Sequence, residues 1–130
     1  MFKYWRQTLQ VFQYVFGEEN PEWTEITVED LHDRLESDPP DLLIDVRSVE
    51  DFTGEKGHLP NAVSIPMLEL ESRIDEISEY KDKEIVTMCP GGGLSLVAVD
   101  ILQEAGFKDV KSLKGGTDQW AQNGYPITHE

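Results

Sequence analysis

The chain contains a single cysteine, Cys89, and its neighbours suggest how it could act as a nucleophile. A short apolar run, residues 84–88, precedes it, and Pro-Gly-Gly-Gly-Leu-Ser follows it. Three consecutive glycines let the backbone turn tightly, so that several N–H groups can converge on one point above the sulfur. Because Pro90 has no N–H, the candidate donors are the five amides of Gly91, Gly92, Gly93, Leu94 and Ser95.

A strand, a cysteine, a glycine-rich turn and a helix in succession would form a cradle for an anion. The helix adds the positive end of its dipole, and Ser95 could cap its N-terminus. Both effects favour a thiolate at Cys89. A persulfide also bears negative charge, so the same amides could hold its outer sulfur without a side-chain base. The alternative is an ordinary buried cysteine at a strand end, followed by glycines that only make a turn.

The cysteine and histidine content argues against a disulfide or a metal site. One cysteine cannot form an internal disulfide, and no second thiol accompanies the widely spaced His32, His58 and His129. We therefore expect neither a metal nor another cofactor. An unpaired thiol is typical of a reducing compartment, which predicts a cytoplasmic protein.

The charge balance excludes one large class of partners. The chain of 130 residues has 26 acidic and 11 basic residues, a net charge of -15, which argues against binding the phosphate backbone of a nucleic acid. The acidic residues are dispersed, as on a well-solvated surface. No stretch approaches the ~20 apolar residues of a membrane span. The N-terminus also lacks the uniform apolar region of a signal peptide.

Several elements must position the cysteine. From Thr24 onward short apolar runs alternate with helical stretches, which predicts a single α/β domain with a largely parallel sheet. The strand candidates are residues 42–46, 62–65, 84–88 and 110–113. The first helix candidate starts at a Thr27 and Asp30 capping pair, has Leu31 and Leu35 on its inward face and is stopped by Pro39-Pro40. The other helix candidates are residues 67–77, 96–102 and 119–122. Functional groups usually emerge at the carboxyl ends of such strands.

Asp45 and Arg47 end the first of these strands, on the side where Cys89 should emerge. We interpret Asp45 as structural support that caps backbone amides of the next turn. Arg47 has two interpretations, between which the sequence does not decide. It either pairs with a carboxylate such as Glu50 or supplies a basic group that binds an anionic substrate.

Residues 1–23 are predicted to be an N-terminal amphipathic helix and a linker. Apolar residues recur at steps of three and four, and Pro21 lies in the linker. Packing on its own domain, or dimerisation with a second copy, is the default role for this helix. Docking of a partner is an alternative, and attachment to a membrane is weaker because only Lys3 and Arg6 could attract anionic lipid. The stripe consists of Phe2, Trp5, Leu9, Phe12 and Phe16.

Residues 24–130 resemble the rhodanese-like family through motifs that occur in the same order. Leu43–Arg47, with Glu50 and Phe52, resembles the Asp-Val-Arg segment of the family, and Gly57–Ala62, with Ile65-Pro66, resembles its Gly-His-Ile-Pro-Gly-Ala stretch. Cys89–Ser95 matches the active loop in position and length. The C-terminal signature is matched by Gly115-Gly116, Trp120 and Gly124–Ile127.

The resemblance implies a parallel five-stranded sheet flanked by helices, and a sulfurtransferase or sulfur carrier. Cys89 would take sulfane sulfur from thiosulfate, polysulfide or a persulfide, and pass it to a thiol or protein acceptor. Many active members have an arginine where this chain has Leu94, and a guanidinium would help to hold an anionic donor. We therefore expect weak thiosulfate activity and favour a persulfide donor. The alternative function is a non-catalytic rhodanese-like binding module.

Phosphatases and arsenate reductases built on the related fold are a weaker match. They resemble Cys-x5-Arg, and the residue six positions after Cys89 is Ser95. Phosphoryl transfer would lack its main electrostatic clamp.

Overall fold

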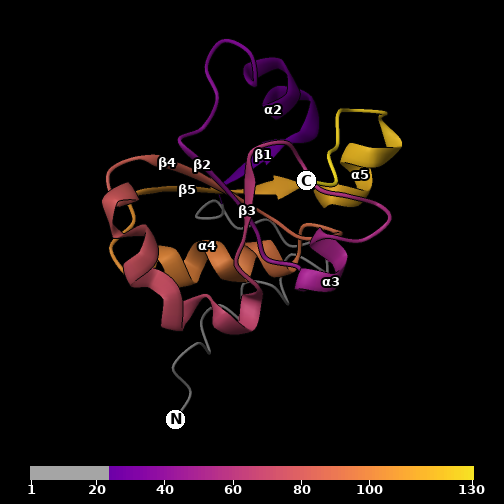
Figure 1. The fold of residues 1–130 in the computed structure, drawn as a ribbon. Helices are drawn as coiled ribbons and strands as arrows, with labels where there is room; N and C mark the ends of the chain where they lie inside the picture. The colour runs from indigo at the N-terminus through magenta and orange to yellow at the C-terminus, as the bar shows by residue number, and fades with distance from the viewer. Residues whose placement is uncertain (1–23) are drawn as a thin grey trace.

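A five-stranded parallel sheet organises the computed structural model, which describes residues 24–130 (Figure 1). The spatial order is β1-β5-β4-β2-β3, and every strand pairing is parallel. The central strand β4 therefore delivers Cys89 to the middle of the carboxyl edge. This confirms the predicted sheet. The strands are β1 Glu25–Thr27, β2 Leu42–Asp45, β3 Ala62–Ser64, β4 Glu84–Met88 and β5 Asp109–Lys114.

Helices cover both faces of the sheet (Figure 1). The 3-10 segments and α4 lie on one face, and α2 and α5 lie on the other. The helices are α2 Val28–Arg34, α3 Val49–Phe52, η1 Met67–Glu69, η2 Glu71–Tyr80, α4 Leu94–Glu104 and α5 Gly116–Gln122. The predicted N-terminal helix, and its pairing with a second copy, concern residues outside the described range.

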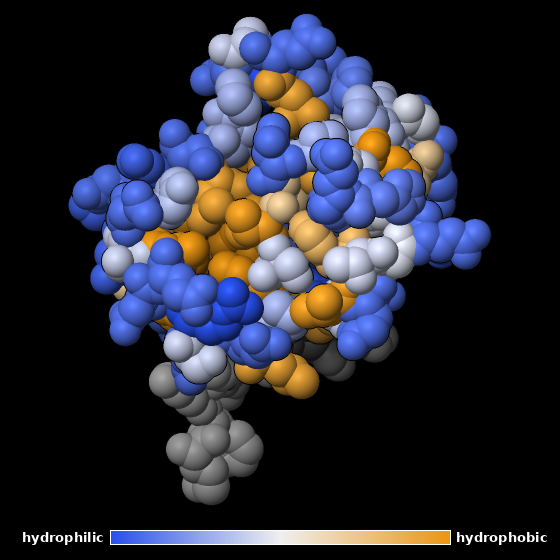
Figure 2. All heavy atoms as spheres, in the orientation of Figure 1, coloured by the Kyte–Doolittle hydropathy of each residue, from blue (hydrophilic) through white to orange (hydrophobic). Residues whose placement is uncertain are grey.

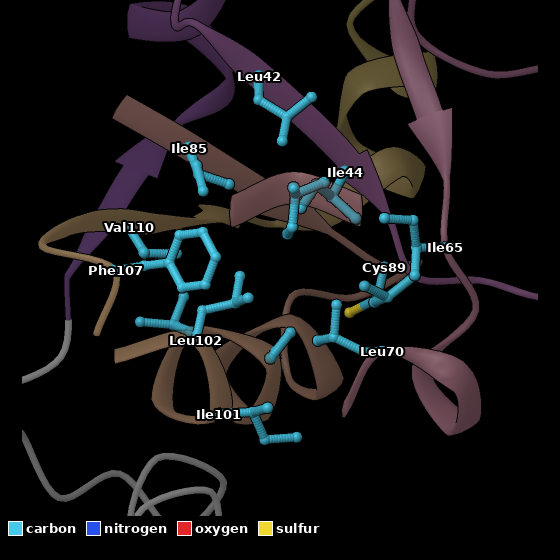
Figure 3. Close-up of a cluster of buried hydrophobic side chains, with 14 residues drawn as sticks. Leu42, Ile44, Ile65, Leu70, Ile85, Cys89, Ile101, Leu102, Phe107 and Val110 are labelled. Carbon is cyan, nitrogen blue, oxygen red and sulfur yellow. The ribbon is translucent and has the colours of Figure 1, made fainter. Parts of the chain in front are cut away.

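The alternation of side chains along β4 divides the interior into two apolar clusters. Ile85 and Cys89 face α4, whereas Val86 and Met88 face α2 and α5. In Figure 3 Cys89 lies at one end of the first cluster, beside Ile65 and Leu70 from the segment that follows β3. The cysteine therefore sits at the border between the core and the carboxyl edge of the sheet.

Two local predictions can be compared with the structure here. Thr27 caps α2 as expected, since its Oγ1 accepts a hydrogen bond from the Asp30 amide at 3.1 Å. The prediction of one helix over residues 67–77 was wrong, because two 3-10 segments follow each other there and Ile77 has non-helical angles. The Ser72 hydroxyl donates to the Glu69 carbonyl at 2.9 Å, an interaction that competes with regular helical hydrogen bonds.

Other differences arise from short elements. The last helix begins at Gly116, three residues before the predicted start, and its N-cap Gly115 is left-handed with φ of 84°. The sequence analysis missed β1 and α3. A three-residue strand and a single helical turn are too short to show a periodicity.

The surface is strongly polar. Hydrophilic residues dominate the face in Figure 2 and surround a central group of apolar residues. No helix within residues 24–130 is both long and apolar enough to cross a bilayer.

An ionic cluster ties α2 to the amino-terminal edge of the sheet. Arg34, at the end of α2, donates from both Nη atoms to the carboxylate of Glu84 at the start of β4. The Nζ atom of Lys111 on β5 donates to the same carboxylate at 2.9 Å. The hydrogen bonds from Arg34, followed by those from Lys111, lower the pKa of Glu84 to about 2.

Replacing Glu84→Gln should lower the free energy of unfolding at pH 7 by about 1 kcal/mol, because the pair is only partly shielded from water. The folded-state pKa is depressed, so this contribution is present above the unfolded pKa of about 4.3 and is lost as the pH falls toward 2. Urea unfolding at pH 7, 4 and 3 would measure it. An equal gap between wild type and variant at all three pH values would contradict this account.

Glu76→Gln is the matched control. Glu76 pairs with Arg73 on an exposed face of η2, where solvent screens the charges. This variant should change the unfolding curve much less than Glu84→Gln does at pH 7.

Candidate active site at the end of the central strand

The backbone after β4 folds back over the Cys89 sulfur. The Gly92 amide donates to Sγ at 3.1 Å and the Ser95 amide donates at 3.3 Å. The side chain is buried, with the residue 2% exposed. Two of the five predicted donors thus reach the sulfur itself, and the peptide groups after the cysteine face the thiol.

The first turn of α4 adds to this arrangement. α4 has 11 residues and begins at Leu94, so its positive end lies beside Cys89. Converging N–H groups and a helix N-terminus both stabilise negative charge, so the geometry suits a thiolate or a charged persulfide.

The prediction that Ser95 caps α4 was wrong. The N-cap is Gly93, which already has helical angles, and no side chain caps this end. Ser95 lies one residue inside the helix and is buried. Its hydroxyl points to the sheet instead, where the Cys89 thiol donates to Ser95 Oγ at 3.4 Å.

Two buried hydroxyl residues on the sheet contact Ser95, and the sequence analysis missed both. Thr87 on β4 donates from Oγ1 to the Ser95 carbonyl at 2.9 Å. Ser112 on β5 places its Oγ 2.6 Å from Ser95 Oγ. Thr87 and Ser112 are register partners, so they stand side by side beneath the first turn of α4. The signal in the sequence was a polar residue at an inward position of each apolar strand.

The N-terminus of α5 donates hydrogen bonds to the start of the cysteine loop. The Thr117 amide donates to the Cys89 carbonyl at 2.9 Å, and the Asp118 amide donates to the Pro90 carbonyl at 3.0 Å. Gly116 lies so close that a Cβ atom there would collide with both carbonyls. The adjacent glycines of the C-terminal motif therefore let α5 approach the loop closely.

Asp45 and Arg47 form a buried ion pair at the end of β2. Arg47 Nη2 donates to Asp45 Oδ2 at 2.8 Å and to the Gly57 carbonyl at 2.9 Å. The carboxylate of Asp45 also accepts the Arg47 amide at 3.0 Å. Arg47 thus pairs with a carboxylate, as one of its two interpretations expected, but the partner is Asp45 and not Glu50. Substrate binding by Arg47 stays a prediction.

His58 holds the turn that precedes β3. Its Nδ1 lies 2.7 Å from the Phe52 carbonyl, and its ring stacks on Phe52 at 3.6 Å between centroids. Both contacts are within the fold, which agrees with a structural role for this imidazole.

Two exposed leucines, Leu94 and Leu68, lie in segments that flank the core cluster containing Cys89. Leu94 is 56% exposed in the loop, and Leu68 is fully exposed on η1. Met67, next to Leu68, and Val97, three residues after Leu94, pack against the core cluster that contains Cys89. The loop position just before Ser95 is thus an exposed apolar one.

Comparisons with known proteins agree with this geometry. Residues 27–123 match the model of the rhodanese-like domain family. A sulfurtransferase of Allochromatium vinosum is 35% identical over 103 residues, which cover 79% of this chain and 92% of that protein. Thiosulfate sulfurtransferase 16 of Arabidopsis thaliana is 31% identical, covering 64% of this chain and 76% of the relative.

A solved structure supports the fold. The solution structure of a rhodanese-like domain from Anabaena has a TM-score of 0.73 and 30% sequence identity. The superposition covers 82% of this chain and 79% of that chain.

Gly116→Ala tests the support of the loop by α5. We expect a loss of roughly 2–5 kcal/mol in the free energy of unfolding, because left-handed strain adds to the collision with two carbonyls. The rate of Cys89 alkylation should change as well, since the loop must move. Denaturant unfolding and iodoacetamide labelling would measure both effects.

Gly124→Ala is the matched control for backbone strain. Gly124 has φ of 75°, similar to the 67° of Gly116, but no atom lies within 4 Å of its Cβ position. Gly124→Ala should lower the free energy of unfolding by only about 1–2 kcal/mol and leave the rate of Cys89 alkylation unchanged. Equal effects of the two variants would show that contact with the loop is unimportant.

Proposed function

The chain belongs to the rhodanese-like domain family, and we propose that it acts as a sulfurtransferase or sulfur carrier that forms a persulfide on Cys89. The observation that carries the proposal is the convergence of the Gly92 and Ser95 amides on Sγ. A sulfurtransferase among its relatives supports the reaction class.

The reaction would proceed in two balanced steps. The Cys89 thiolate attacks the sulfane sulfur of the donor, and an S–S bond forms while the donor leaves with the electron pair of its broken bond. A thiolate of the acceptor then attacks the outer sulfur of the persulfide. The electron pair of the Cys89 S–S bond returns to Sγ, where the same two amides stabilise the charge of the leaving thiolate.

The loop favours a persulfide on a protein or small thiol over thiosulfate as the donor. Thiosulfate is an anion, and the loop side chain at position 94 is an exposed leucine. The Arg47 guanidinium is already engaged by Asp45 and the Gly57 carbonyl.

The proposed acceptor and cellular compartment follow from the same chemistry. A protein or small-molecule thiol is the acceptor that the second step needs. The unpaired thiol fits a reducing compartment, and we infer a cytoplasmic location.

A non-catalytic binding module is the second candidate. The specific observation in its favour is the burial of Cys89, whose exposed fraction is only 2%. In this alternative the loop would only stabilise the domain, and no donor would reach the sulfur.

Intact-mass measurement distinguishes the two candidates. After incubation with glutathione persulfide, polysulfide or thiosulfate, the wild-type protein should gain one sulfur atom, and a thiol should remove it. Cys89→Ser should gain none, because the chain has no other cysteine. Wild-type protein that stays unmodified with all three donors would support the binding module and overturn the proposal.

Replacing Leu94→Arg tests the choice of donor. The guanidinium should raise kcat/KM for thiosulfate about 10-fold or more, because a charge-assisted hydrogen bond to an anion becomes available. The value for glutathione persulfide should change less. Steady-state sulfur transfer to cyanide would measure both.

Leu68→Arg is the matched control for charge. It adds the same positive charge at a fully exposed position outside the loop. If it raises thiosulfate turnover as much as Leu94→Arg does, the effect is general electrostatic attraction and the loop position is not special.

A further inference from the structure

A closed circuit of hydrogen bonds links Cys89 to a serine on a neighbouring strand. The Cys89 thiol donates to Ser95 Oγ at 3.4 Å, and Ser95 Oγ lies 2.6 Å from Ser112 Oγ. Ser112 Oγ lies 3.4 Å from the Gly92 carbonyl, to which it can donate. The amide of the same Gly92 donates back to Sγ. Ser95 and Ser112 are both fully buried.

The directions of these hydrogen bonds depend on the charge of the sulfur. With a neutral thiol, each hydroxyl can pass its proton forward, from Ser95 to Ser112 and from Ser112 to the Gly92 carbonyl. With a thiolate, Ser95 must donate to the sulfur, so its oxygen needs a donor of its own. Ser112 Oγ, at 2.6 Å, is placed to be that donor.

The distances indicate that reversing the directions of these hydrogen bonds costs little free energy. The contact given up is the one from Ser112 to the Gly92 carbonyl, which at 3.4 Å is long and weak. The 2.6 Å contact between the two hydroxyls is kept in both directions. The contact between Ser95 and the sulfur becomes charge-assisted, which strengthens it.

We propose that Ser112 is a positioning residue that turns the Ser95 hydroxyl toward the sulfur and so stabilises the Cys89 thiolate. It acts through Ser95, since its own contacts are to Ser95 and Gly92. The thiolate is both the attacking group and the group that leaves when sulfur is delivered. The consequence for sulfur transfer rests on the proposed function, whereas the effect on thiol reactivity does not.

The charged groups on the surrounding elements have other partners or positions. Asp45 and Arg47 on the β2 side bind each other, and Glu69 on η1 pairs with Arg73. Asp118 on α5 is exposed, and Asp100 lies on α4 beyond its first turn. Within residues 24–130, the Ser95 hydroxyl is the side-chain group in hydrogen-bonding contact with the sulfur, and Ser112 contacts that hydroxyl in turn.

The rate of Cys89 alkylation by iodoacetamide, measured across a range of pH, tests the proposal. Cys89 is the only thiol in the chain, so the measured rate belongs to this residue alone. Ser112→Ala should slow alkylation at pH 7 by about 2- to 10-fold, the effect of losing one neutral hydrogen bond. It should also shift the pH profile to higher pH. Ser112→Thr keeps the hydroxyl and should restore the wild-type profile.

Ser64→Ala is the matched control. Ser64 is a partly buried serine on β3 whose Oγ has no hydrogen-bond partner among residues 24–130. Rate constants are compared only for variants that retain a cooperative unfolding transition. Should Ser112→Ala fail that criterion, the comparison of Ser112→Thr with Ser112→Val, which match in shape, replaces it.

The outcomes separate the two claims. An unchanged pH profile in the variant lacking the hydroxyl, or the same shift in Ser64→Ala, would overturn the role of Ser112. A shifted profile in a protein that takes up no sulfur from any donor would support the role of Ser112 and contradict the proposed function.

Discussion

The donation of two main-chain amides to one buried sulfur is the interaction on which the site depends. The amides of Gly92 and Ser95 can meet at Cys89 only if the chain reverses immediately after β4 and starts a helix beneath the sheet. The central place of β4 makes this reversal possible, because strands on both sides leave room for the loop only at the carboxyl edge. The anion cradle is thus a consequence of the sheet order as much as of the glycines.

The loop is held by groups far apart in the sequence. Amides at the start of α5 bind the carbonyls of Cys89 and Pro90, while Thr87 and Ser112 hold Ser95 from the sheet. Buried polar groups are costly unless they are hydrogen-bonded, and here each contact also fixes a part of the loop. The same contacts therefore satisfy the buried polar groups and orient the donors toward the sulfur.

The charged and polar groups around the loop bear on the proposed choice of sulfur donor. Backbone amides offer partial positive charge without attracting a specific anion, and the loop carries Leu94 where the family resemblance led us to expect an arginine. The buried Arg47 is matched by Asp45, so its charge is balanced within the fold. Such backbone amides can stabilise charge that forms on sulfur. The proposed preference for a persulfide donor rests on the leucine at position 94, because an arginine there would bind the oxygen atoms of thiosulfate.

Much of this arrangement could be predicted from the sequence. The apolar run 84–88, the glycines after Cys89 and the ordered motifs predicted the central strand, the loop and the parallel sheet, because these features depend on local conformation and periodicity. The short elements β1 and α3 escaped prediction, since neither shows a repeat. Ser95 was predicted to cap α4, but the N-cap is Gly93 and the helix already begins at Leu94.

Only the tertiary structure decided which groups meet at the sulfur. Periodicity placed residue 112 in a strand, but only the register of β4 with β5 brings the Ser112 hydroxyl to Ser95. Likewise, the sequence offered Arg47 two roles, and packing at the end of β2 gave it Asp45 as a partner. Local sequence determines the backbone path of the loop, whereas contacts between distant segments depend on strand order and register, which no local pattern records.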